Sequence, residues 1–591
     1  MASTLILIAI GAPWMGAIAV RLLGDRRPGA QHMTAAVASL AAAAAAILLL
    51  WPSHWGVSGE AVIRLPFGAF AGDLTLVADS LGVALAVIAT TVGSLTVIFS
   101  RGYMDGAEQL GRYYALVLIF IGAMCGLVLS GNLLFLFLFW EATAFCSYAL
   151  IAFHNDDPKA VAAGLKALII TQLGGVGLLI GIIVAAAYLP DLQISTLLAA
   201  AGTLPAGVLS VVAFGFLLAA MAKSAQFPLH IWLPDAMEAP TPVSALIHAA
   251  TMVNAGVYLL ARFYPAFAGV PGWSAVVIAM GVTSALLAAL FAVFSNDLKQ
   301  VLAYSTVSQL GYMVAAVGIG AIFESQFHLF SHALFKALLF LSAGAIIHQL
   351  GTRDMREMGG LWRRMPVVAA PFLIGAAALV GLPFFNGFWS KELLLETALE
   401  SNPLGVCLPL AAGAAITAIY AARMCRMVFF APPRHGATEA RLHVSLSMSL
   451  PLALLAAGVM SAWLLAEPLA NWMRATLPFH ADFILPHRAA DSLIATHTVF
   501  APSTLIILSL TLAGLVAGRR ASHTPGQESR VAPGVGRIES FFNGSAGAVV
   551  SATRHSAALL QKTQTGQLSW NIVGIILGLI ALLVLLLQGV V

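Results

Sequence analysis

Three ionisable side chains are spaced four residues apart in one apolar stretch of the sequence. His328, His332 and Lys336 lie within a segment that runs from Phe327 to Phe340, whose other residues are mostly apolar. On an α-helix, residues four apart lie on one face, one above the other. One charge at the centre of a membrane-spanning helix costs about 2.5–3.5 kcal/mol on insertion scales. A row of titratable groups is therefore costly there, and the pattern predicts part of a proton path.

Two lysines interrupt other apolar stretches beside residues that break helices. Pro228 follows Lys223 closely, and Gly381 and Pro383 precede Lys391. Proline removes a helical hydrogen bond, so we expect a break next to each lysine. Freed carbonyl groups and a buried ammonium group are tolerated together only where they face a hydrated cavity. Both lysines are therefore candidates for the same proton path.

Two further candidates are a carboxylate and an imidazole. Glu141 follows eight apolar residues, where a carboxylate must be paired or protonated. His248 is predicted to share a helical face with Ser244 and Thr251. An ion pair between Glu141 and Lys223 would preserve both charges, and making or breaking it would switch their proton affinity.

Each of these four residues also has a structural alternative. Glu141 would be an interfacial charge if its span is short, and Lys223 would be a lysine that extends to the membrane surface. His248 would be a histidine satisfied within the core. Lys391 would be an interfacial residue paired with Glu392.

The composition restricts the class of protein. The 591 residues are 60% hydrophobic and only 9% charged, which indicates a polytopic membrane protein. The net charge of +4 gives no reason to expect a nucleic-acid partner. The four cysteines form no CxxC pair, and there is no nucleotide-binding loop, metal cluster or nucleophile–base pair. We therefore expect no cofactor, no metal and no redox centre in this chain.

Apolar stretches long enough to cross a membrane number sixteen, and the first is expected to be a retained span. If the loop after the first span is cytoplasmic, 22 Lys and Arg residues fall on the cytoplasmic side and 4 on the other. This bias predicts that both termini are extracytoplasmic. The expected spans are 3–23, 31–51, 77–100, 112–130, 133–153, 164–188, 207–229, 241–262, 272–294, 299–320, 324–350, 366–400, 405–430, 445–467, 499–518 and 569–590.

The two broken helices predict two inverted five-helix repeats, because they would run in opposite directions at matching places in two halves. Residues 52–76 could form a short extracytoplasmic β-hairpin. Residues 519–568 are either a flexible linker or a helix on the membrane surface. The expected divisions are 1–111 (N-terminal spans and loop), 112–262 and 272–430 (half-channel repeats), 431–518 (additional spans) and 519–591 (surface segment and last span).

Residues 222–237 (AKSAQFPLHIWLPDAM) and 239–253 (APTPVSALIHAATMV) resemble the signature of antiporter-like subunits. That family comprises the large proton-pumping subunits of respiratory complex I, the A subunits of Mrp-type Na+/H+ antiporters and membrane subunits of related hydrogenases. Residues 298–312 also match, and the resemblance covers about residues 75–430. Its implied roles are a coupling pair (Glu141 and Lys223), a link (His248), a central relay (His328, His332 and Lys336) and an exit (Lys391).

The resemblance implies a proton-translocating membrane subunit of a complex I-like, NADH-quinone oxidoreductase-type assembly in the cytoplasmic (inner) membrane. Its partners would be other membrane subunits, protons and the lipid bilayer. Complex I relatives often carry an Arg and an Asp near Gln172 and Gly175, and Mrp relatives tend to have Lys where Asn254 stands; this sequence has neither feature. Two alternatives therefore stay open: an Mrp-type Na+/H+ antiporter component with Na+ as the coupled ion, and a membrane subunit of a hydrogenase or carbon-uptake complex.

Overall fold

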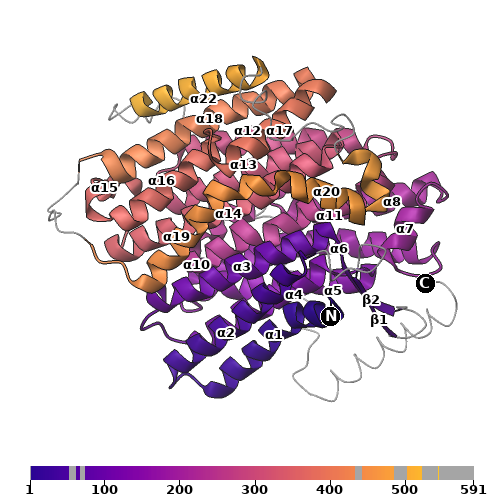
Figure 1. The fold of residues 1–591 in the computed structure, drawn as a ribbon, viewed down its shortest axis with the longest axis horizontal. Coiled ribbons are helices and arrows are strands. Elements are labelled where there is room, and N and C mark those ends of the chain that lie inside the picture. The colour runs from indigo at the N-terminus through magenta and orange to yellow at the C-terminus, as the bar shows by residue number, and fades with distance from the viewer. Residues whose placement is uncertain are drawn as a thin grey trace.

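The computed structural model describes residues 2–51, 61–66, 73–432, 442–484 and 502–521, together with the single residues Gly544 and Ser551. Within these residues, thirteen helical segments are long and apolar enough to cross a membrane. They pack side by side into one bundle (Figure 1). The chain is therefore an all-α polytopic membrane protein, as predicted. The number of sixteen spans stays a prediction, since 569–590 and most of 519–568 lie outside the described residues.

The N-terminal part consists of three helices and a hairpin. The helices are α1 (Ala2–Leu23), α2 (Pro28–Leu48) and α3 (Ser80–Tyr103), and the strands are β1 (Ala61–Pro66) and β2 (Asp73–Ala78). The strands pair antiparallel, with Val62 opposite Val77, which confirms the hairpin expected in this loop. We call the membrane side that carries it the hairpin side, and the other the opposite side.

The next five membrane crossings begin with three continuous helices, α4 (Leu110–Val128), α5 (Leu133–Ile151) and α6 (Pro158–Ala186). A short helix, α7 (Ile194–Ala200), leads into α8 (Ala206–Lys223). The chain then continues through η2 (Leu229–Ile231), α9 (Trp232–Asp235) and η3 (Ala236–Glu238). The fifth crossing is made of α10 (Thr241–Ala245), the π-turn η4 (Leu246–Ala250) and α11 (Met252–Phe267).

A second set of five crossings has a similar order. It consists of α12 (Trp273–Phe294), α13 (Leu298–Gly318), α14 (Ile322–Leu350), the pair α16 (Pro366–Val380) and α17 (Asn386–Ser401), and α18 (Leu408–Cys425). Between α14 and α16 lie η5 (Met355–Glu357) and α15 (Leu361–Arg364), and π-turns η6 (Pro403–Cys407) and η7 (Arg426–Phe430) flank α18.

The remaining helices cover the outside of this bundle. They are α19 (Leu446–Ser461), η8 (Ala462–Leu465), α20 (Ala466–Thr476), η9 (Pro478–Phe483) and α22 (Pro502–Ala521). In Figure 1, α1 and α2 lie at one edge of the bundle and α22 lies at the opposite edge, beside α18. The two sets of five crossings therefore form its middle.

Matching backbone contacts occur in the two sets of crossings. In the first set, the N–H of Leu133 donates to the carbonyl of Leu192 and the N–H of Ile194 donates to Gly131, both at 2.8 Å. In the second set, the N–H of Leu298 at the start of α13 donates to the carbonyl of Arg353, and the N–H of Met355 donates to Asn296, at 2.9 Å each. Helix α3 begins beside the hairpin, and each following crossing runs in the opposite direction to the one before it. The contact in the first set therefore lies on the hairpin side, and the contact in the second set lies on the opposite side. This relation supports the interpretation of two inverted repeats.

Both helices that carry the candidate lysines are broken, as predicted. Helix α8 ends at Lys223, and Ala225 then takes a left-handed φ of 49°. Between α16 and α17, Gly381 and Phe384 have φ values of 87° and 77°. A left-handed residue stops the helical run of hydrogen bonds, so carbonyl groups near each break are available to other donors.

The span expected at 241–262 is confirmed as Thr241–Phe267, but the helical face expected for Ser244, His248 and Thr251 is interrupted. A π-turn at η4 is followed by Thr251 with φ −132° and ψ −103°, which ends the first helical piece. The Thr251 hydroxyl donates to Leu246 O at 2.7 Å, and the Asn254 amide donates to Ala249 O at 2.9 Å. These polar side chains satisfy carbonyls that lost their helical partners. His248 and Thr251 therefore do not share one α-helical face.

Gly387 allows α17 to approach α16 closely, so we expect Gly387→Ala to destabilise the fold. A Cβ atom there would collide with the carbonyl oxygen of Ala378. Overpacking of this kind costs about 1–3 kcal/mol, and it would also displace Lys391 on the same helix. Thermal unfolding of the detergent-purified protein measures this loss. The control is Gly207→Ala, since a Cβ atom added at this helical glycine would have nothing within 4 Å; equal melting temperatures for both variants would contradict the packing argument.

Candidate functional site

Lys223 is fully buried at the end of α8 and contacts α5. Its ammonium group donates to the backbone carbonyl of Trp140 and lies 4.2 Å from the centroid of the Trp140 ring. The carbonyl oxygen of Ala222, freed by the helix break, accepts a hydrogen bond from the Trp232 indole at 2.9 Å. The lysine is therefore held by an aromatic face and a carbonyl group.

Glu141 is the next residue after Trp140, but it faces a different helix. Its carboxylate accepts a hydrogen bond from the Gln172 amide of α6. Among the described residues, no ion pair within 4.0 Å joins Glu141 to Lys223. The structure therefore places Lys223 against Trp140, the residue next to Glu141, but each of the two charged groups has a different hydrogen-bond partner.

His248 lies on the π-turn η4 and is fully buried. Its ring stands between Trp232, at 6.3 Å between centroids, and Phe340 of α14, at 5.9 Å. Neither ring nitrogen has a hydrogen-bond partner in the described part of the protein. His248 therefore lies where the first set of crossings packs against α14 of the second.

The predicted row on α14 faces α13 and α17. Nε2 of His328 lies 3.1 Å from Oε1 of Gln309 on α13, and Nδ1 lies 2.9 Å from Oγ of Ser390 on α17. At the other end of the row, the Lys336 ammonium donates to Leu302 O at 2.9 Å and to the Ser305 hydroxyl.

His332 lies between these two, and neither of its ring nitrogens has a partner among the described residues. All three side chains of the row are fully buried. Since buried polar groups in proteins are nearly always hydrogen-bonded, a buried imidazole of this kind is a costly feature of the row.

Lys391 on α17 bonds directly to the second helix break, whereas Lys223 bonds to the neighbouring continuous helix α5. The Lys391 ammonium donates to the carbonyl of Leu379 at 2.8 Å, at the end of α16. It lies 5.7 Å from the centroid of the Tyr312 ring on α13. Each of the two lysines therefore contacts a backbone carbonyl and an aromatic face.

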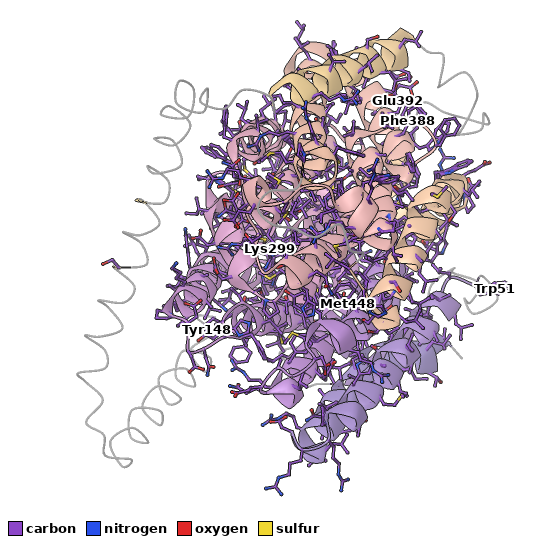
Figure 2. All side chains as sticks on the ribbon, turned by 90° about the vertical axis from the view of Figure 1, so that its left-hand side faces the viewer. Trp51, Tyr148, Lys299, Phe388, Glu392 and Met448 are labelled. Atoms are coloured by element: carbon purple, nitrogen blue, oxygen red, sulfur yellow. The ribbon has the colours of Figure 1, made fainter. Side chains whose placement is uncertain are left out.

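The sequence interpretation did not include Lys299 among the candidates, because it counted this residue on the cytoplasmic side, at the first position of the span 299–320. Lys299 is buried in the first turn of α13, and its position is labelled in Figure 2. Its ammonium donates to the carbonyls of Met237 and Ala239, at 2.6 Å each. The available signal was Asp297, whose carboxylate caps α13 by accepting from the N–H of Lys299. An N-cap there begins the helix at residue 298 and so places the lysine inside it.

Charged groups surround this lysine on the opposite side. Arg353 pairs with both Glu238 and Asp297, at 2.7 Å in each case. Burial raises the pKa of Asp297, whereas the ion pair with Arg353 and the N–H donors of α13 act in the other direction. This network ties η3, α13 and the end of α14 together where Lys299 enters the bundle.

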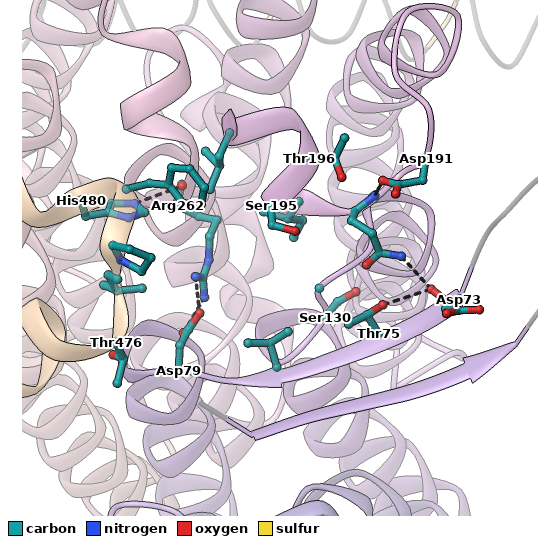
Figure 3. A pocket seen from close by; sticks show the side chains of 18 residues that line it. Asp73, Thr75, Asp79, Ser130, Asp191, Ser195, Thr196, Arg262, Thr476 and His480 are labelled. Atoms are coloured by element: carbon teal, nitrogen blue, oxygen red, sulfur yellow. Dashed lines mark hydrogen bonds and ion pairs between the residues drawn. The ribbon is translucent and has the colours of Figure 1, made fainter. Parts of the chain in front are cut away.

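A cleft of about 560 Å³ opens on the hairpin side (Figure 3). Asp73, Asp191 and Asp79 line it, so it is acidic. The Asp79 carboxylate forms a bidentate ion pair with Arg262 of α11, and Figure 3 shows these two side chains pointing toward each other. His480 of η9 donates from Nε2 to Ala261 O at 3.0 Å and closes one wall. The cleft therefore brings solvent close to the hairpin-side end of α11.

The described residues contain no group of three His, Cys, Asp or Glu side chains arranged to hold a metal ion. What they contain is a set of buried lysines and histidines that contact carbonyls, hydroxyls, amides and aromatic rings. These groups extend from α5 and α8 through η4 and α14 to α17. Such a set can hold and pass protons.

Comparison with known proteins agrees with this geometry. The family model described as "NADH:quinone oxidoreductase/Mrp antiporter, TM" matches residues 130–417, and "NADH-Ubiquinone oxidoreductase (complex I), chain 5 N-terminus" matches residues 65–114. The NAD(P)H-quinone oxidoreductase chain 5 of Picosynechococcus sp. is 41% identical over 75% of this chain and 71% of its own length. Its counterpart from Synechocystis sp. is 42% identical over 66% of this chain.

A third relative is the A1 subunit of the Na(+)/H(+) antiporter of Staphylococcus haemolyticus, which is 37% identical over 77% of this chain. The matches span 60% of the Synechocystis protein and 61% of the Staphylococcus protein, so these relatives are longer than the matched part.

Two solved structures have the same architecture. A chain of the Mrp complex from Dietzia sp. matches with a TM-score of 0.75 and 30% identity, over 100% of this chain and 63% of that one. A chain of the membrane-bound sulfane sulfur reductase, an archaeal respiratory membrane complex, matches with a TM-score of 0.70 and 23% identity, over 82% of this chain and 97% of that one, which shows the fold alone. Together with the family models and the relatives, these matches confirm the resemblance: the chain belongs to the NADH:quinone oxidoreductase/Mrp antiporter family of membrane subunits.

Proposed function

We propose that this chain is a proton-translocating membrane subunit of a larger ion-translocating assembly in the cytoplasmic membrane. The observation that carries the proposal is the series of buried lysines and histidines across both sets of crossings. Lys223 starts it, His248 and the α14 row continue it, and Lys391 ends it. A series of costly buried groups indicates transport rather than structural support.

The contacts of the lysines suit proton transfer. Lys223, Lys336 and Lys391 donate to backbone carbonyls, and Lys336 also to a hydroxyl. A lysine that is paired with a buried carboxylate leaves an unpaired anion when it loses its proton, which is costly. A lysine on carbonyl groups avoids that cost, so it can release and regain a proton more easily.

The two histidines between the lysines have matching roles in the proposal. His328 contacts an amide oxygen and a hydroxyl, so both its ring nitrogens are engaged in a chain of hydrogen bonds. His332 lies one turn further along α14, between His328 and Lys336. An imidazole can accept a proton on one nitrogen and release one from the other, which allows it to pass protons along the row.

The chemistry of the series favours H+ over Na+. Na+ is a hard cation, and such cations are bound by several oxygen ligands, whereas the residues of this series are mainly cationic or imidazole groups. The alternative, an Na+/H+ antiporter component, is favoured by the match of the Dietzia Mrp complex to the whole chain. Exchange of Na+ for K+ in sealed vesicles distinguishes the two, because only an antiporter loses its proton flux when Na+ is absent.

Purification from native membranes tests which assembly the protein belongs to. We expect the protein, extracted gently from native membranes, to carry other membrane subunits that mass spectrometry identifies. Flavin, iron–sulfur or nickel–iron subunits would make it part of a redox-driven pump. Small membrane subunits without redox proteins would make it part of an antiporter. A protein that is purified alone and still moves protons would contradict the proposed assembly.

The distribution of basic residues predicts that both termini lie outside the cytoplasm. The hairpin side is then extracytoplasmic, and the network of Arg353, Glu238 and Asp297 lies at the cytoplasmic surface. Labelling of a cysteine introduced next to β1 or next to Arg353 tests this assignment.

A further inference from the structure

The α14 row has a fourth member that the spacing of histidines and lysine did not include. Glu324 lies four residues before His328, so the row reads Glu324, His328, His332 and Lys336 at a constant interval of four. Residues four apart on a helix have Cβ atoms about 5–6 Å from each other. The Glu324 side chain is buried, with 3% of the residue exposed. The row therefore ends in a carboxylate.

Glu324 and His328 contact the same neighbouring helix in parallel. The hydroxyl of Thr397 donates to Oε1 of Glu324 at 3.1 Å, and the hydroxyl of Ser390 lies 2.9 Å from Nδ1 of His328. Both hydroxyl residues belong to α17 and are seven residues apart, which is about two helical turns. From His328 to Glu324, the row on α14 therefore runs alongside α17 toward the C-terminus of α17. Each of these two residues contacts a hydroxyl of that helix.

Glu324 occupies the hairpin-side end of the row. It stands in the first turn of α14, and α14 begins on the hairpin side because the crossings alternate from α3. The turn just before it, at Gly320, lies close to the Tyr264 hydroxyl at the end of α11. Tyr264 in turn contacts Phe483 of η9, with ring centroids 5.0 Å apart. These elements also form the hairpin-side surface of the bundle.

A second buried carboxylate in this region faces elsewhere. Glu392 on α17 accepts a hydrogen bond from the Thr504 hydroxyl of α22, and Figure 2 shows it close to that outer helix. Of these two carboxylates, Glu324 is the one on the helix that carries the histidine row.

We propose that Glu324 is a proton-transferring residue that connects the α14 row to the hairpin side of the membrane. This inference rests on the proposed function. The step is a simple transfer: the N–H bond of protonated His328 breaks, and an O–H bond forms on the Glu324 carboxylate, one helical turn away on α14. The O–H bond then breaks, and the proton passes to water on the hairpin side. Glu324 thereby acts in series with Lys391, as the last group before water on the hairpin side.

The test uses the complete assembly in sealed native membrane vesicles, with a pH-sensitive dye to follow proton flux. We expect Glu324→Gln to reduce the flux by about a hundredfold, the typical effect of removing a proton-transferring group. Glu324→Asp keeps a titratable carboxyl and should restore part of the flux. The matched control is Glu400→Gln, which makes the same chemical change on an exposed residue of α17.

Infrared difference spectroscopy supplies a readout that a structural role would not change. If Glu324 takes up a proton during turnover, a carboxyl C=O band appears in the wild-type protein and is missing in Glu324→Gln. Thr397→Val should shift this band, because it removes the hydroxyl that contacts the carboxylate.

The outcomes separate the exit role from the proposed function when Lys336→Met is measured in parallel. Loss of flux in both variants, with the missing band, supports the exit role. Loss of flux in Lys336→Met alone overturns the role of Glu324 and leaves the proposed function standing. Wild-type flux in both variants overturns the proposed function as well. A flux loss in Glu324→Gln that matches a lower melting temperature, with the band still present, also overturns the exit role, since Glu324 then only stabilises the first turn of α14.

Discussion

Replacing Lys336 with methionine should reduce proton flux by about a hundredfold or more, since it removes the group that begins the α14 row. The substitution keeps a long apolar stem and removes the ammonium that contacts Leu302 O and Ser305. Because no carboxylate is paired with Lys336 among the described contacts, the variant leaves no buried anion behind. We therefore expect it to fold and assemble normally, so that dye-monitored flux in sealed vesicles reports on transport.

The control for this variant is Lys159→Met, which removes a lysine from the exposed start of α6. It should leave the flux unchanged. Normal assembly of Lys336→Met is checked by mass spectrometry of the copurified subunits. Wild-type flux in a fully assembled Lys336→Met protein would show that the α14 row does not carry protons.

Removing one partner of the Asp79–Arg262 pair should lower the free energy of unfolding by about 3–5 kcal/mol, because it leaves an unpaired charge in a buried site. The two side chains are only 6% and 8% exposed. Arg262 also donates to the Tyr258 hydroxyl at 3.1 Å, and Asp79 accepts from the N–H of Gly82 as the N-cap of α3. The pair therefore joins α3 to α11, and Arg262→Met should separate their ends.

Thermal unfolding in detergent measures this effect, and the chain supplies a matched control. Arg356 and Asp354 also form a close ion pair, at 2.7 Å, but their side chains are 52% and 29% exposed. Exposed pairs contribute about 0–1 kcal/mol, so Arg356→Met should change the melting temperature little. A double variant, Asp79→Asn with Arg262→Met, should recover part of the loss by removing both charges. Equal destabilisation by the two single Arg variants would contradict the role of burial.

The parts of the site that the sequence predicted correctly depend on local rules. Residues four apart share a helical face, so the row of His328, His332 and Lys336 is recognisable from spacing alone. Proline and glycine end helices, so the breaks beside Lys223 and Lys391 are recognisable from residue type.

The parts that the sequence did not predict depend on contacts between distant segments. The partner of Glu141 is Gln172 of another helix, and no local pattern identifies it. Thr251 and Asn254 stabilise a break without any proline or glycine, by bonding carbonyls on the preceding π-turn. A basic residue at the start of a span is usually exposed, which is why the sequence interpretation counted Lys299 on the cytoplasmic side and not among the buried candidates. Only the carbonyls of η3 and the turn after it explain why it is buried.

The central claim is that a single series of buried groups carries protons through both sets of crossings. The most direct test compares Lys223→Met and Lys391→Met, at the two ends of the series, in sealed vesicles that contain the fully assembled complex. If the series is one path, each variant should lose proton flux as completely as Lys336→Met does. If either variant, fully assembled, retains the wild-type flux, that lysine lies outside the path and the claim of one continuous series is wrong.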